Sequence, residues 1–161
     1  MINSFLKERN LFEVNFDNFE DFRNFVTEKV VSFCCDDECK ERITQLLDKK
    51  LHIFPAVFGK YYTIIHIYDE SVEKTQLLLF RNNKLLLFKR HKYLKDNYIN
   101  LLFVIISNKK NSQHYMKLKG RIIRVLETFN KEINENLNKI SLQQLRNNLA
   151  GYERNILNLK Y

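Results

Sequence analysis

The chain has 161 residues, of which 45% are hydrophobic, so its composition excludes a disordered protein and allows one domain with a substantial core. Its formal net charge is +8, but the Lys and Arg residues are spread along the whole sequence, and we do not expect direct nucleic-acid binding. There is no apolar run long enough to span a membrane and no apolar signal-peptide segment, so we expect a cytoplasmic protein without membrane insertion.

The first third of the chain predicts one strand and two helices. Alternation of apolar and polar residues indicates the strand, whereas apolar residues at helical spacing indicate the helices. The predicted elements are a short helix or lead-in at 2–9, a strand at 11–16, a helix from Asp17 or Asn18 to Ser32, a helix from Asp36 or Asp37 to Lys49-Lys50, and a loop at 51–60.

The middle of the chain predicts four strands. They are expected at 61–68, 75–81, 85–90 and 99–107. Asn82-Asn83 separates the second from the third and predicts a two-residue hairpin turn. The last of the four is the most hydrophobic, so we expect it at the centre of the sheet.

The last third of the chain predicts three helices. They are expected from Asn111 or Ser112 to Phe129, near 131–138, and from Ser141 onward, where Ser141-Leu142-Gln143-Gln144 resembles a capping box. This order of elements predicts an α/β protein in which a mixed sheet lies between two helical layers. No linker or repeat divides the sequence, so we expect one domain over residues 1–161.

Two histidines are the candidate functional residues. His66 lies near the end of the strand predicted at 61–68, and His114 lies in the first turn of the helix that follows the strand at 99–107. If these strands are parallel neighbours, both imidazoles lie at the carboxyl edge of the sheet, where open α/β folds bind ligands. The alternative is that His66 is a structural strand-end residue and that His114 is solvated.

The pair suits phosphoryl transfer, because a neutral imidazole nitrogen can attack phosphorus and a helix N-terminus can hold phosphate oxygens. In this hypothesis His66 is the nucleophile and His114 steadies the phosphate, helped by backbone N–H groups near Ser112. Lys49, Lys50 and Lys60 are the nearest cations in the predicted topology.

Cofactor and metal sites are not expected. Cys34, Cys35 and Cys39 have no second ligand cluster at a metal-site spacing, although His52 is nearby, and an odd number of cysteines favours reduced thiols. His91 lies in the basic stretch Lys89-Arg90-His91-Lys92 and is expected to be solvated.

From Leu11 to about Leu149 the chain resembles the enzyme IIA domain of the bacterial sugar phosphotransferase system, of the fructose–mannitol type. The likeness rests on the element order, on the strand-polar-helix start Val14-Asn15-Phe16-Asp17, and on two histidine segments, Thr63-Ile64-Ile65-His66 and His114-Tyr115. It implies a IIA-like three-layer α/β/α fold in which His66 is the phosphorylated residue.

The sequence departs from the family pattern around His66. Ile65 stands where the family has Pro, and Lys49-Lys50 falls at the family's Arg-Glu pair, so Lys49 is the candidate phosphate-binding cation. A Lys cannot supply the two-pronged grip of an Arg on a phosphate. The preceding loop is bulky, with Phe54-Pro55-Ala56-Val57-Phe58 in place of Gly and Thr.

The resemblance implies transfer of a phosphoryl group from phospho-HPr to His66 and on to a IIB-type domain. Because the surrounding motif is degraded, a role in a sugar-responsive transcriptional regulator, beside that regulator's other domains, fits better than sugar transport. Two alternatives stay open: a silent IIA-like domain that serves interaction or homodimerisation, and a basic nucleic-acid-binding protein of unrelated role.

Overall fold

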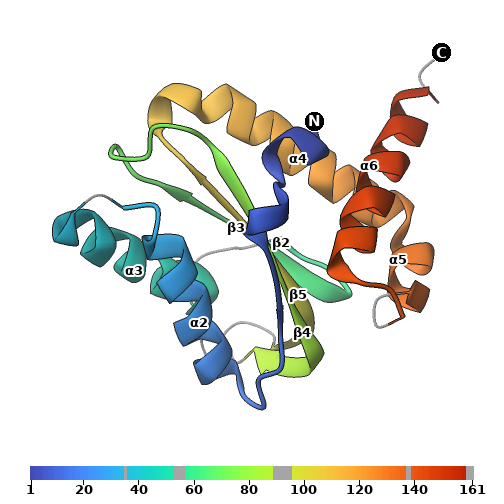
Figure 1. Cartoon of the computed structure of the whole chain (residues 1–161), viewed down its shortest axis with the longest axis horizontal. Helices are drawn as coiled ribbons and strands as arrows, with labels where there is room; N and C mark the ends of the chain where they lie inside the picture. Colours follow the sequence, from blue (N-terminus) through green and yellow to red (C-terminus); the bar gives the residue numbers. More distant parts are fainter. Residues whose placement is uncertain (35, 53–56, 89–95, 137–138, 159–161) are drawn as a thin grey trace.

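A computed structural model describes the chain except for residues 35, 53–56, 89–95, 137–138 and 159–161 (Figure 1). Five strands form one mixed sheet in the order β1-β4-β5-β3-β2. The strands are β1 (Leu11–Val14), β2 (Val57–Phe58), β3 (Tyr61–Tyr68), β4 (Gln76–Phe88) and β5 (Asn97–Ser107). β1 is parallel to β4, and β3 is parallel to β5, whereas β4 is antiparallel to β5 and β2 is antiparallel to β3.

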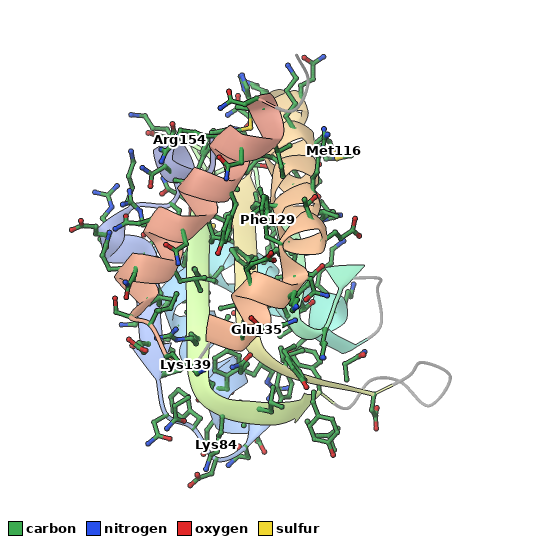
Figure 2. The ribbon with its side chains drawn as sticks, turned by 90° about the vertical axis from the view of Figure 1, so that its right-hand side faces the viewer. Lys84, Met116, Phe129, Glu135, Lys139 and Arg154 are labelled. Atoms are coloured by element: carbon green, nitrogen blue, oxygen red, sulfur yellow. The ribbon has the colours of Figure 1, made fainter. Side chains whose placement is uncertain are left out.

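Helices cover both faces of this sheet, so the predicted three-layer α/β/α architecture is confirmed. Figure 1 shows α2 and α3 on one side of the strands and α4 and α6 on the other. In the view of Figure 2, α4, α5 and α6 lie over the near face of the sheet. The helices are α1 (Ile2–Phe5), α2 (Phe19–Val31), α3 (Asp37–His52), α4 (Ser112–Thr128), α5 (Asn130–Asn136) and α6 (Leu142–Asn158), with 3₁₀ turns η1 (Glu8–Asn10) and η2 (Lys109–Asn111).

Each face of the sheet carries its own apolar core, because side chains of successive strand residues point to opposite faces. On the central strand β5, Phe103 and Ile105 pack in the core beneath α4 and α6. Their neighbours Val104 and Ile106 pack in the core beneath α2 and α3. The predicted central position of the most hydrophobic strand is therefore confirmed, since both of its faces are covered.

Polar caps begin several helices where the sequence predicted them. The Asn18 side chain accepts a hydrogen bond from Asp21 N at the start of α2. Asp36 Oδ1 accepts from Cys39 N at 2.7 Å, and Ser141 Oγ accepts from Gln144 N at 3.1 Å. Each bond satisfies a backbone N–H that the first turn of a helix leaves without an internal partner.

The hairpin predicted at Asn82-Asn83 is wrong. β4 runs without interruption from Gln76 to Phe88 and pairs with β5 on both sides of a register shift between Arg81 and Leu86. The strand curves near Lys84, as Figure 2 shows. Asn82 is fully buried: its Nδ2 donates to Phe16 O at 3.0 Å, and its Oδ1 accepts from Phe16 N at 2.6 Å. This asparagine therefore ties β4 to the residues after β1, and it does not form a turn.

The loop predicted at 51–60 also needs correction. Helix α3 continues to His52, and Val57 and Phe58 form the short strand β2, which pairs with Thr63 and Ile64. Gly59 follows β2, and a Cβ at this position would lie 2.1 Å from the Tyr62 ring. Residues 53–56, which include most of the bulky part of this segment, lie outside the described residues.

Candidate functional site at the carboxyl edge

The strand that contains His66 and the strand that precedes His114 are parallel neighbours, which is the condition that a site at the carboxyl edge required. β3 pairs with β5 from Tyr61 to Tyr68, and His66 lies opposite Ile105. The carboxyl ends of both strands therefore meet at one edge of the sheet, and α4 begins close by, after η2. β2 pairs only with Thr63 and Ile64, so it ends before it reaches His66.

His66 points from β3 toward α4. Its ring centroid is 4.6 Å from that of Tyr115 and 5.8 Å from that of Tyr68. Its Nδ1 atom lies 3.3 Å from Lys119 Nζ. Tyr115 and Lys119 are four residues apart on α4, so they share one face of this helix. We refer to His66, Tyr68, Tyr115, Lys119 and the nearby Lys50 as the His66 site.

The surroundings of His66 keep its ring neutral. Burial, followed by the positive charges of Lys119 and Lys50, lowers the pKa of His66 from 6.5 to about 4. Burial and the charge of Lys50 also lower the pKa of Lys119. At neutral pH the site thus combines an uncharged imidazole with two cations, which is an arrangement suited to an anion beside a nucleophilic nitrogen.

The contact with Lys119 fixes which ring nitrogen carries the lone pair. An ammonium group can only donate, so Nδ1 of His66 accepts and the hydrogen of the neutral ring is on Nε2. Among the described residues, His66 has no other hydrogen-bond partner. The nucleophilic lone pair is therefore on Nδ1, where Lys119 also lies.

Tyr115 brings a buried hydroxyl next to His66. Its side chain is almost completely buried, and the hydroxyl has no hydrogen-bond partner in the described part of the chain. Burial also raises the pKa of this phenol, so it remains protonated. Buried polar groups are usually satisfied by protein, water or a ligand, so this hydroxyl is a candidate donor to a molecule bound at the site.

His114 has surroundings different from those of His66. It is exposed and lines a cavity of about 480 Å³ together with α1, the residues around η1 and the segment before β4. Its neighbour Tyr115 instead faces His66, because consecutive residues of a helix point in directions about 100° apart. The structure therefore places both histidines near the carboxyl edge of the sheet but does not bring their rings into one cluster.

The predicted phosphate-binding residue Lys49 is not the cation of α3 whose charge acts on His66. Lys49 is exposed on α3, whereas the charge of the adjacent Lys50 acts on His66. Ser112 is the first residue of α4 and precedes the two residues of this helix that contact His66, Tyr115 and Lys119. Lys60 precedes the other end of β3, six residues and about 20 Å of extended strand away, so its predicted proximity to His66 is wrong.

An ion pair occupies the same edge of the sheet. Asp69 follows β3 and accepts from Arg42 Nε at 2.9 Å and from Arg42 Nη2 at 3.1 Å. It also accepts from Ser71 N and from the Ser71 hydroxyl. These bonds, with that to Arg42 the strongest, hold the pKa of the Asp69 carboxyl well below its usual range. The guanidinium of Arg42 on α3 is thus bound to a carboxylate and is not directed at His66.

The cysteines form no cluster with other metal ligands in the described residues. Cys34 and Cys39 are free thiols, and burial and the nearby Cys39 raise the pKa of Cys34 to about 12. No group of three or more His, Cys, Asp or Glu side chains that could hold a metal ion occurs in the part of the chain that the structure describes. Cys35 and His91 lie outside that part.

Sequence reasoning missed Lys119, Tyr115 and the Arg42–Asp69 pair. Tyr115 and Lys119 share a helix face, so the helical period could have linked them to each other. Only the packing of α4 on β3 shows that this face, and not that of His114, is directed at His66. Asp69 carried a stronger signal, since it directly follows a buried strand.

Comparisons with known proteins identify the fold. No protein-family model matches the sequence, and no curated protein matches it at a significant level. A nitrogen regulatory protein IIA-Ntr from Neisseria meningitidis superposes with a TM-score of 0.69 at 13% identity, over 92% of this chain and 98% of that one. IIA mannitol from Escherichia coli superposes with a TM-score of 0.64 at 17% identity, over 89% and 97% of the respective chains.

The chain therefore has the enzyme IIA-like fold of the phosphotransferase system, as its resemblance to that family implied. The agreement covers nearly the full length of both structures, so the helical layers and the sheet are shared. None of the described helices is both long and apolar enough to cross a membrane.

Proposed function

We propose that this IIA-like domain accepts a phosphoryl group from phospho-HPr on His66 and passes it to a IIB-type domain. The observation that carries the proposal is a neutral imidazole at the carboxyl edge of a IIA-like sheet, beside the two cations Lys119 and Lys50. The transfer needs no metal and no organic cofactor, because the histidine itself forms the covalent intermediate.

In this reaction a ring nitrogen of His66 forms a bond to phosphorus while the bond between phosphorus and HPr breaks. The electron pair of the broken bond leaves with HPr. Since Lys119 now lies against Nδ1, it has to move from that nitrogen to the oxygens of the transferred group when Nδ1 is the nucleophile. There it stabilises the added negative charge, with help from Lys50.

The proposed role is regulatory. In the described structure no Arg guanidinium contacts His66. Lys119 offers one ammonium group, whereas a planar guanidinium could donate two parallel hydrogen bonds to a phosphate. Such a site favours slow or occasional phosphorylation, which suits a signal more than continuous flux of a transported sugar. The domain is then part of a sugar-responsive transcriptional regulator, where its phosphorylation state is read by the regulator's other domains.

A second candidate is a silent IIA-like domain that serves interaction or homodimerisation. The observation that favours it is the contact between Lys119 and Nδ1, which occupies the lone pair of the neutral ring. The position of His114 in a separate cavity also favours it, because the imidazole of His114 then does not steady a phosphate on His66.

Intact-mass analysis after incubation with phosphoenolpyruvate, enzyme I and HPr tests the proposal. We expect the wild-type chain to gain one acid-labile phosphoryl group and the His66→Ala variant to gain none. His114→Ala is the matched control, since it removes the other histidine near the same sheet edge and is expected to be phosphorylated.

Two outcomes would contradict the proposal. Phosphorylation of the His66→Ala variant would show that another residue is modified. A wild-type chain that stays unmodified with a cognate HPr would favour the silent domain, and sedimentation analysis would then show whether it is a homodimer.

A further inference from the structure

The cavity lined by His114 lies apart from the His66 site and has a distinct chemical character. Its volume is about 480 Å³, which is in the size range of small-molecule sites. Segments far apart in the sequence form its walls: the N-terminal residues through η1, the residues just before β4, and the start of α4. We call it the basic pocket and define it by Lys7, Arg9, Lys74, Gln76, Asn111 and His114.

Three cations line this pocket, and only one carboxylate, Glu73, accompanies them. The side chains of Lys7, Arg9 and Lys74 form no ion pair or hydrogen bond with any residue that the structure describes. Cations placed close together repel one another, so an arrangement of this kind is stabilised when an anion binds among them.

Two other cavities show that this excess of positive charge is not general. In the cavity of about 370 Å³ beside β3, the cations Arg42 and Lys109 lie with the carboxylates Asp69 and Glu70, and Arg42 is paired with Asp69. In the cavity of about 520 Å³ near α5, Lys60 and Lys131 lie with Glu127 and Glu135. Both are balanced in charge, whereas the basic pocket is not.

The neutral lining of the basic pocket supplies hydrogen-bonding groups. Gln76 Oε1 accepts from Asn10 Nδ2 at 3.5 Å, which leaves the amide NH₂ of Gln76 as a donor. The Asn111 and His114 side chains lie on the wall formed by the start of α4. Amide and imidazole N–H groups beside Arg and Lys are typical partners of phosphate oxygens.

We infer that the basic pocket binds a small polyanion that carries at least two phosphate-type groups, which bridge Lys74 and the Lys7–Arg9 segment. A single phosphate fills only a small part of a cavity of about 480 Å³, whereas a diphosphate or a bisphosphorylated small molecule supplies several separated anionic oxygens. The pocket is lined by residues other than those of the His66 site.

Isothermal titration calorimetry with pyrophosphate at low ionic strength tests this inference, and inorganic phosphate serves as the smaller probe. We expect pyrophosphate to bind the wild-type chain more tightly than phosphate does. The double variant Arg9→Gln/Lys74→Gln should bind pyrophosphate at least about tenfold more weakly, because two charge-assisted contacts are lost. Both residues are exposed, so the substitutions leave the core intact.

Two double variants with the same change in net charge serve as controls. Lys60→Gln/Lys131→Gln removes two cations near α5, and Lys50→Gln/Lys119→Gln removes the cations beside His66. Both should retain pyrophosphate binding within about twofold, apart from the small effect of net charge. Amide chemical shifts of Thr75 and His114 should move on titration and thereby locate the ligand.

Three results would overturn the inference. The first is that the wild-type chain does not bind pyrophosphate at millimolar concentration. The second is that a control variant loses as much affinity as the pocket variant, since binding would then reflect net charge or the His66 site. The third is equal affinity for phosphate and pyrophosphate, which would exclude a bridged polyanion.

Discussion

The protonation state of His66 is set by three neighbours from two helices. Tyr115 and Lys119 of α4 cover its ring and approach Nδ1, and Lys50 of α3 adds a second positive charge. Tyr68 of the same strand completes the surroundings. Burial lowers the pKa of His66 more than either lysine does. The ring would therefore stay mostly neutral at pH 7 even without Lys119 and Lys50.

We expect the ring of His66 to titrate with a pKa of about 4 in the folded chain. Lys119→Met should raise this pKa, but not to 6.5, since burial still disfavours the charged imidazolium. NMR titration of the ring carbon-bound protons measures both values. Lys117→Met is the matched control, because Lys117 is exposed on the same helix and should leave the titration unchanged.

The lowered pKa of His66 also affects stability. The unfolded chain binds a proton at His66 below about pH 6.5, whereas the folded chain does so only near pH 4, so the free energy of unfolding decreases as the pH is lowered from 6.5 to 4. Because the ring is only half-buried and solvent screens part of the shift, the effect is at most about 3 kcal/mol, and it should be absent in His66→Gln. Urea unfolding of both proteins at pH 7 and pH 4 gives the difference; parallel losses of stability would contradict the prediction.

Long strand β4 joins most of the sheet together, because it pairs with β1 on one side and with β5 on the other. Its curvature follows the register shift at Arg81–Leu86, where Asn82 bonds to the backbone of Phe16. Two consecutive asparagines thus have different roles. Asn82 is buried and hydrogen-bonded to the backbone, whereas Asn83 is exposed.

Asn82→Ala should lower the free energy of unfolding by about 2–4 kcal/mol, because it leaves the N–H and C=O of Phe16 without their partners. Asn83→Ala should change stability by less than about 0.5 kcal/mol. Chemical denaturation of the two variants tests this contrast. Equal effects would favour the turn that the sequence predicted.

Gly59 lies at the junction of β2 and β3, where Tyr62 leaves no room for a side chain. Gly59→Ala should destabilise the fold by about 1–3 kcal/mol, since the new Cβ must displace a buried ring. Gly120→Ala is the opposite case, because Gly120 is an exposed position of α4 with open space around it, and should stabilise by about 0.5–1 kcal/mol. Thermal unfolding should show a lower melting temperature for Gly59→Ala and a higher one for Gly120→Ala than for the wild-type chain.

At the scale of the whole molecule, two apolar cores share one sheet. The core beneath α2 and α3 contains the ring of Phe80, which stacks on Phe12 at 4.9 Å. On the opposite face, Phe129 stacks on Tyr152 of α6 at 4.3 Å, and Phe129 is labelled between the helices in Figure 2. The sheet separates the two cores, and among the described elements only its strands contribute side chains to both.

We expect the chain to unfold as one cooperative unit, because each central strand contributes side chains to both cores. Val104→Ala and Ile105→Ala remove buried groups from opposite faces and should each lower stability by about 2–4 kcal/mol. Calorimetry should show one transition for both variants. Two separated transitions in either variant would mean that the layers fold independently.

The sequence by itself determined the layer architecture and most of the elements, because hydrophobic period and capping residues are local signals; β2 and the uninterrupted β4 are the exceptions. Asn18, Asp36 and Ser141 cap the first turns of their helices as predicted. The long apolar run of β5 correctly predicted the central strand. The sequence also placed His66 near the end of a buried strand, whereas the parallel pairing of that strand with β5 was a condition that the structure meets.

Only the tertiary structure decided which side chains surround His66. His114 and Tyr115 are adjacent in sequence, yet the rotation of α4 on the sheet directs one toward the basic pocket and the other toward His66. The same holds for Asn82, whose partner Phe16 is brought near only by the pairing of β1 with β4. Local pattern specifies elements, whereas the orientation of each element follows from packing that no short stretch of sequence contains.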